Sequence, residues 1–136
     1  MTNADDPYRL KELADREARA REMGGADKLA RQQSKGRLNA RQRVEQLLDP
    51  DSFDEHGLLA VSDLPQMADK TPADGKVAGF GAIEERTVFV SADDVTVLAG
   101  AGGRVGTGKQ FKGMQYAMGS TPLMRTLQRR PKLAIR

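Results

Sequence analysis

Cysteine is absent from this chain of 136 residues, which excludes disulfide bonds, thiolate catalysis and cysteine-ligated zinc sites together. Tryptophan is absent too, and only four phenylalanines and two tyrosines are present, so aromatic platforms for stacking nucleic-acid bases are scarce. The single histidine, His56, has no second histidine with which to hold a metal, and it reads as a turn residue. We therefore expect neither a metal site nor a nucleic-acid partner.

Long apolar runs are also lacking. No stretch of about 18 apolar residues is present, and no apolar signal-peptide core follows the first residues, so we expect no membrane contact and a cytoplasmic location. Hydrophobic residues make up 38% of the chain, which is lean for a self-sufficient core and fits a chain that packs against a partner. The net charge of +3 is mild, because acidic and basic residues are interleaved along most of the chain.

Hydrophobic periodicity and turn residues predict a helical first third and a mixed remainder. We expect an irregular segment over 53–75, and Asn39 is a good helix N-cap. The hairpin connection is expected at 84–86, and a helix is expected to begin at Gly108 or Lys109. The other predicted elements are helices over 8–23, 26–34, 41–48 and 123–127, and strands over 76–83, 87–91, 95–98 and 132–135.

A run rich in glycine follows the predicted strand at 95–98 and ends at Lys109. Residues 103–109 have the G-x-x-x-x-G-K frame of a nucleotide-binding loop, in which backbone N–H groups hold phosphates. Gln110 stands where that mechanism needs serine or threonine for Mg²⁺, and no acidic residue follows it. A nucleotide site is therefore the weaker alternative, beside a purely structural glycine turn.

Four cations lie within nine positions, Lys35, Arg37, Arg41 and Arg43, next to a predicted helix start. Such a cluster can bind a phosphate-rich ligand, and taken alone it can equally be a solvated face. The neighbouring carboxylates at 93 and 94 would point to opposite faces of a strand, which makes them a poor acid–base pair. The methionines at 114, 118 and 124 recur at helical spacing, which is typical of core or subunit-interface packing.

Three segments in one order resemble the carboxyltransferase subunits of biotin-dependent acyl-CoA carboxylases. Residues 25–55, with Lys-Gly-Arg-Leu-Asn-Ala-Arg and Leu-Leu-Asp-Pro-Asp-Ser-Phe, resemble the family's N-terminal segment. Residues 74–83, Asp-Gly-Lys-Val-Ala-Gly-Phe-Gly-Ala-Ile, are similar to its D-G-V-V-T-G-x-G-x-I. Residues 88–103 are similar to its strand ending in D-[FY]-T-V-x-G-G-x-x-G. The resemblance covers roughly residues 25–112 and is more specific than the G-x-x-x-x-G-K frame.

The resemblance implies an α+β fold, a partial crotonase-like half-domain of the β-β-α spiral type preceded by N-terminal helices. It divides the chain into a helical segment with the basic CoA-side motif (1–50), a loop (51–74) and the partial crotonase-like unit (75–136). It implies an acyl-CoA substrate, biotin carried by a partner protein, and no covalently bound cofactor. In this family backbone N–H groups form the oxyanion holes, one in a D-S-G-G-A-R-like segment that this sequence lacks, so no catalytic residue is expected here.

We therefore expect a small subunit of an acyl-CoA carboxylase complex that is inactive alone. A larger carboxyltransferase chain would supply the oxyanion holes, a biotin carboxylase or carrier subunit would supply the carboxyl group, and the assembly would be a hetero-oligomer. The alternatives are a non-catalytic assembly or regulatory subunit and a small nucleotide-binding protein. The residues expected to bind CoA, through charge and close backbone approach, are Lys35, Arg37, Arg41, Gly100, Ala101, Gly102, Gly103 and Lys109.

Overall fold

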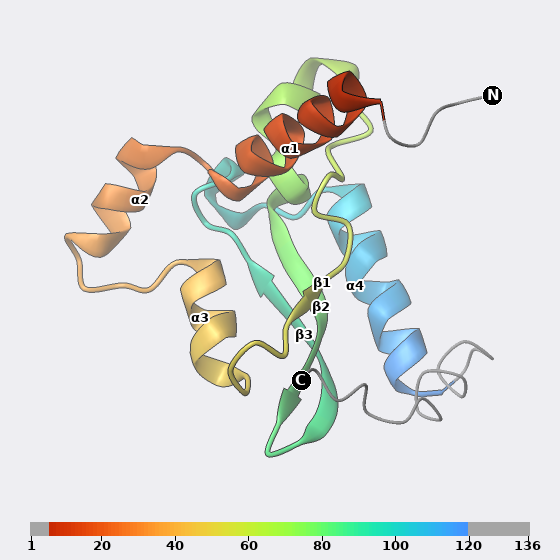
Figure 1. Ribbon diagram of the computed structural model, residues 1–136. Coiled ribbons are helices and arrows are strands. Elements are labelled where there is room, and N and C mark those ends of the chain that lie inside the picture. Colours follow the sequence, from red (N-terminus) through yellow and green to blue (C-terminus); the bar gives the residue numbers. More distant parts are fainter. Residues whose placement is uncertain (1–5, 120–136) are drawn as a thin grey trace.

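The structure is a computed structural model that describes residues 6–119. Three strands form one antiparallel sheet in the order β1-β2-β3, and mixed helix and sheet confirm the expected α+β class (Figure 1). Short 3-10 turns connect the larger elements. The helices and strands are α1 (Pro7–Arg21), α2 (Ala26–Gln33), α3 (Ala40–Leu47), β1 (Asp54–Glu55), β2 (Lys76–Ile83), β3 (Arg86–Asp93) and α4 (Arg104–Ala117).

Local capping signals start the first and third helices. The Asp6 carboxylate accepts a hydrogen bond from the backbone N–H of Tyr8 (3.0 Å), and proline occupies the first turn of α1. At α3, Asn39 and Gln42 form a reciprocal capping box, in which each side chain accepts from the other residue's backbone N–H. The predicted N-cap at Asn39 is therefore confirmed.

The β2–β3 hairpin turns through two glutamates in left-handed conformation, Glu84 (φ 48°) and Glu85 (φ 65°). A two-residue turn of this kind normally uses asparagine or glycine, because a side chain with positive φ is strained. The Asp49 carboxylate, at the end of α3, accepts from both turn amides at 3.1 and 2.8 Å and holds the strained turn. The hairpin is predicted correctly, and β3 runs longer at both ends than expected.

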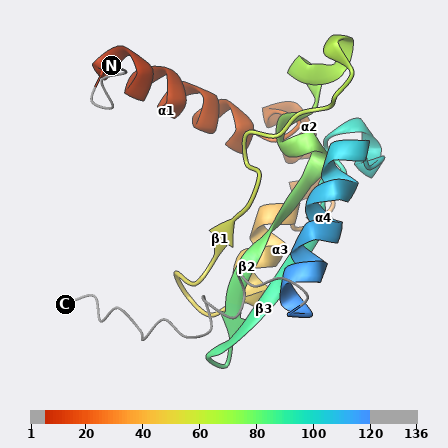
Figure 2. The ribbon, with the colours of Figure 1, turned by 90° about the vertical axis from the view of Figure 1, so that its right-hand side faces the viewer.

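The sheet lies between α3 and α4, as the side view shows (Figure 2). On the α3 face, Val44 and Leu48 pack against Val77 and Val90, which forms the main buried cluster. A side chain at Gly81 would collide with Leu48, so glycine lets the helix lie close to β2. The α3 face is therefore the better-filled side of the sheet.

Two sequence predictions in the glycine-rich region are wrong. Residues 95–98 form no strand: the Asp94 carboxylate accepts from both the backbone N–H and the hydroxyl of Thr96 and bends the chain into a turn. This side-chain hydrogen bonding overrides the β-propensity of the valines and Thr96. Helix α4 begins at Arg104, ahead of the predicted start at Gly108 or Lys109, because the Asp74 carboxylate accepts from the backbone N–H of Gly106.

Several expectations concern residues beyond the described ones. The helix predicted over 123–127 and the strand over 132–135 lie outside residues 6–119, and the three-part division of the chain stays a prediction. Within residues 6–119, no helix is both long and apolar enough to cross a membrane.

Candidate functional site

Arg41 is held inside the fold by an ion pair with Glu55. The pair is bidentate: the two terminal guanidinium nitrogens lie 2.6 and 3.0 Å from the two carboxylate oxygens. Only 18% of the Arg41 side chain and 11% of the Glu55 side chain is exposed. A bidentate pair of this burial ties α3 to β1, and the Nε of Arg41 is buried without a hydrogen-bond partner among the described residues.

Lys109 is likewise engaged within the fold. Its ammonium donates to the backbone carbonyls of Gly57 (3.1 Å), Ala73 (2.8 Å) and Lys76 (2.7 Å), which accounts for all three of its N–H groups. Burial lowers the pKa of Lys109 from 10.5 to about 8, with the Glu55 and Asp74 carboxylates opposing the shift. Lys109 thus ties α4 to three other segments, and it lies within α4 rather than at its start.

Asp74 occupies the place where a nucleotide loop would hold phosphate. It is 2% exposed, adopts a left-handed conformation (φ 47°), and its carboxylate accepts from the Gly106 N–H at 2.5 Å. Any side chain at Gly103 would collide with this carboxylate, and Gly106 and Gly108 are helical. The G-x-x-x-x-G-K frame is therefore the first turns of a capped helix, and the nucleotide alternative loses its structural basis.

The remaining predicted site residues are exposed, apart from the half-buried Gly100. Neither Lys35 nor Arg37 makes a side-chain ion pair or hydrogen bond within residues 6–119, and both side chains face solvent at the α2–α3 connection. Gly100 ends a short turn at φ 80°, and Ala101 and Gly102 follow on the surface.

The predicted residues fall into two groups. Arg41 and Lys109 come together around Glu55, and Asp74 links Gly103 to the same cluster. No hydrogen bond or ion pair among the described residues joins Lys35 or Arg37 to that cluster.

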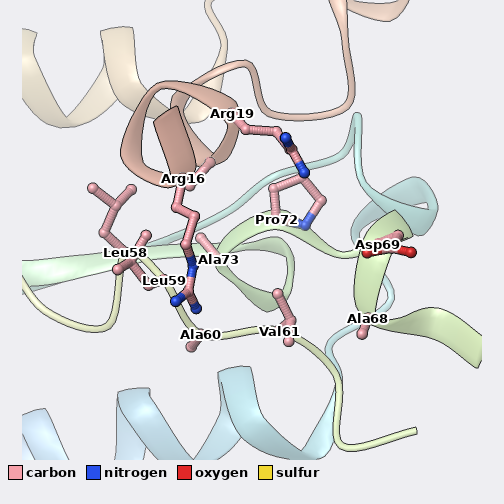
Figure 3. Close-up of a pocket in the computed structure, with 11 residues that line it drawn as sticks. Arg16, Arg19, Leu58, Leu59, Ala60, Val61, Ala68, Asp69, Pro72 and Ala73 are labelled. Carbon is pink, nitrogen blue, oxygen red and sulfur yellow. The ribbon is translucent and has the colours of Figure 1, made fainter. Parts of the chain in front are cut away.

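A pocket that the sequence analysis missed lies between α1 and the segment before β2 (Figure 3). Its volume is about 220 Å³, and Arg16 and Arg19 of α1 stand over it. The sequence gives little indication of this pocket, because the apolar residues of the segment 58–73 come to lie beneath these arginines only in the folded chain. The other lining residues are Ala20, Leu58, Leu59, Ala60, Val61, Ala68, Asp69, Pro72 and Ala73.

The described residues hold no group of three or more histidine or acidic side chains arranged to bind a metal ion. His56 instead packs edge-on against the Phe80 ring, with ring centroids 5.3 Å apart.

Comparison with known proteins gives consistent matches. The family described as the carboxyl transferase domain matches residues 31–134. The propionyl-CoA carboxylase beta chain of Roseobacter denitrificans is 38% identical over 112 residues, 80% of this chain and 22% of that protein. The biotin-dependent acetyl-/propionyl-CoA carboxylase beta5 subunit of Mycobacterium tuberculosis is 36% identical over 113 residues, 81% of this chain and 21% of that protein. The chain spans about a fifth of the length of these curated relatives.

Among solved structures, the transcarboxylase 12S hexamer with hydrolysed methylmalonyl-CoA bound overlaps this fold with a TM-score of 0.77. The two are 34% identical, and the overlap covers 86% of this chain and 24% of that one. This likeness confirms the partial crotonase-like architecture that the sequence predicted.

Proposed function

Because this chain belongs to the carboxyl transferase domain family, we propose that it forms the acyl-CoA side of a biotin-dependent acyl-CoA carboxyltransferase. The observation that carries the proposal is the match over residues 31–134, which spans the basic segment, the hairpin and α4. Relatives named as propionyl-CoA and biotin-dependent acetyl-/propionyl-CoA carboxylase subunits support an acyl-CoA substrate and biotin on a partner carrier protein. The chain itself would hold no covalent cofactor.

In this proposal, the exposed residues of the predicted site contact CoA directly. Lys35 and Arg37 have free cationic groups that can form charge-assisted hydrogen bonds with phosphates. The segment 100–103, with three glycines, lets a ligand approach the backbone closely. Arg41 and Lys109 act behind this surface: their contacts with Glu55 and with three carbonyls support its position.

The proposal further assigns the oxyanion holes to more carboxyltransferase sequence on a larger chain. The outward face of α4 supports this, because Phe111, Met114 and Met118 recur at helical spacing and are 62%, 46% and 75% exposed. An apolar stripe of this size on a solvated helix is typical of a surface that another part of a protein covers. The larger chain would pack on this face, in a hetero-oligomer that also includes the biotin-carrying subunit.

Calorimetric titration with propionyl-CoA tests the ligand. We expect the double substitution Lys35→Gln/Arg37→Gln to weaken binding about tenfold, as the loss of charge-assisted hydrogen bonds implies. The matched control is Arg86→Gln/Lys112→Gln, which removes two exposed cations elsewhere and should change affinity less than about twofold. Equal weakening by both pairs would show a nonspecific charge effect and contradict the assignment.

Complementation tests the assembly. The 136-residue chain would be co-purified with a carboxyltransferase relative that has been shortened to lack its homologous segment. We expect carboxyltransferase activity only when both chains are present. If the shortened relative is fully active alone and still binds this chain, the non-catalytic assembly role is correct instead.

A further inference from the structure

The basic residues of α1 divide into two classes. Arg9, Lys11 and Arg21 each pair with a carboxylate on or beside the same helix, at 3.9, 2.6 and 3.2 Å. The side chains of Arg16 and Arg19 make no ion pair and no hydrogen bond within residues 6–119. These two unpaired cations are also the two that line the pocket.

Sequence spacing alone would allow both arginines a partner. Glu12 and Asp15 lie four residues before Arg16 and Arg19, the spacing at which a helix favours an acid–base pair. The arginine side chains instead reach across the pocket: Arg16 extends over Leu59 and Ala60, and Arg19 extends toward Pro72 (Figure 3). Two guanidinium groups therefore line one cavity, and neither forms an ion pair with a carboxylate within residues 6–119.

The remaining lining is mostly apolar. It comes chiefly from the leucine, alanine and valine side chains of residues 58–61 and from Ala68, Pro72 and Ala73. Asp69 is the one acidic residue of the lining, so the pocket keeps a net positive charge. At about 220 Å³ the cavity is smaller than the roughly 300–1,000 Å³ of a site for a drug-sized ligand, so it suits one small group.

We propose that this pocket is a second anion site, which binds a phosphate monoester carrying a short aliphatic chain. A phosphate monoester offers three terminal oxygens and can accept from two guanidinium groups at once, whereas one carboxylate is satisfied by a single guanidinium. The aliphatic part lies against residues 58–61. The site does not rest on the acyl-CoA role, because Lys35 and Arg37 do not line it.

The probe for this site is butyl phosphate, added to isotope-labelled full-length chain and followed by NMR. We expect shifts of the backbone amides of residues 58–61, and tighter binding of butyl phosphate than of inorganic phosphate or butyrate. Arg16→Gln/Arg19→Gln should weaken binding by tenfold or more. The control Arg9→Gln/Arg21→Gln removes two ion-paired cations from the same helix and should leave the affinity within about twofold.

Three results would overturn the proposal. Shifts confined to other residues would place the ligand elsewhere. If inorganic phosphate binds as tightly as butyl phosphate, the site does not recognise the aliphatic chain. If butyrate binds as tightly as butyl phosphate, the site has no preference for phosphate. If Arg16→Gln/Arg19→Gln abolishes butyl phosphate binding while Lys35→Gln/Arg37→Gln leaves it intact, the pocket is separate from the proposed CoA surface.

Discussion

At the residue scale, two effects oppose each other at the half-buried ammonium of Lys109. Its hydrogen bonds stabilise the fold, whereas burial disfavours its charged form. Three backbone carbonyls accept hydrogen bonds from it, yet burial lowers its pKa from 10.5 to about 8. Between these two pH values the unfolded chain binds more protons than the folded chain. The free energy of unfolding should therefore rise as the pH increases from about 8 to about 10.5.

Comparison with Lys109→Met isolates this effect. From pH 7.5 to pH 10 we expect the free energy of unfolding of the wild type to increase by about 1–2 kcal/mol more than that of the variant. This figure allows for solvent screening. Urea unfolding followed by circular dichroism at both pH values measures the difference. The same difference at both pH values would contradict the lowered pKa.

Arg41 gives a second residue-scale prediction. Arg41→Gln leaves the Glu55 carboxylate with little solvent and without its bidentate partner, so we expect a loss of about 2 kcal/mol in the free energy of unfolding. Adding Glu55→Gln should recover part of this loss, since the unpaired charge is removed. Arg43→Gln, whose exposed guanidinium contacts only a backbone carbonyl, is the control and should cost much less. If Arg41→Gln costs no more than the control, the ion pair is not structural.

The structural roles of some residues could be predicted from the sequence and those of others could not, for a physical reason. The Asn39 cap depends on Gln42, three residues away, and could be predicted. The hairpin connection could be placed between two strand patterns, whereas the Asp49 carboxylate that holds it lies 35 residues away. The partners of Arg41 and Lys109 lie 14 or more residues away, so their internal roles required the fold. The contact of Asp74 with the start of α4 could not be predicted from the sequence, because Asp74 and Gly106 are 32 residues apart.

At the element scale, α4 fits the sheet because it carries glycine where it crosses β3. A side chain at Gly113 would overlap the Phe89 ring, whereas a side chain at Gly108 would meet nothing within 4 Å. Gly113→Ala should therefore lower the free energy of unfolding by about 1–3 kcal/mol through overpacking. Gly108→Ala should raise it by up to about 1 kcal/mol, because alanine favours a helix.

The two alanine variants form a matched pair within one helix. Thermal unfolding of both should shift the midpoint in opposite directions from wild type. A loss of stability in Gly108→Ala equal to that in Gly113→Ala would mean that α4 does not pack as described.

At the scale of the whole molecule, the chain buries one face of its sheet well and leaves the outward side of α4 apolar. Phe111→Gln/Met118→Gln should change the free energy of unfolding of the isolated chain by less than about 0.5 kcal/mol, because both side chains are already exposed. The same substitutions should prevent activity in the complementation experiment. Lost stability without lost activity would assign this face to the chain's own core.

The contact between Asp49 and the hairpin turn also has a consequence for the order of folding. The two glutamates of the turn are poor formers of a left-handed bend, so residues 76–93 have little reason to close on their own. The carboxylate that stabilises the bend belongs to the end of α3, 35 residues earlier in the chain. We therefore expect closure of the hairpin to be coupled to the docking of α3 during folding.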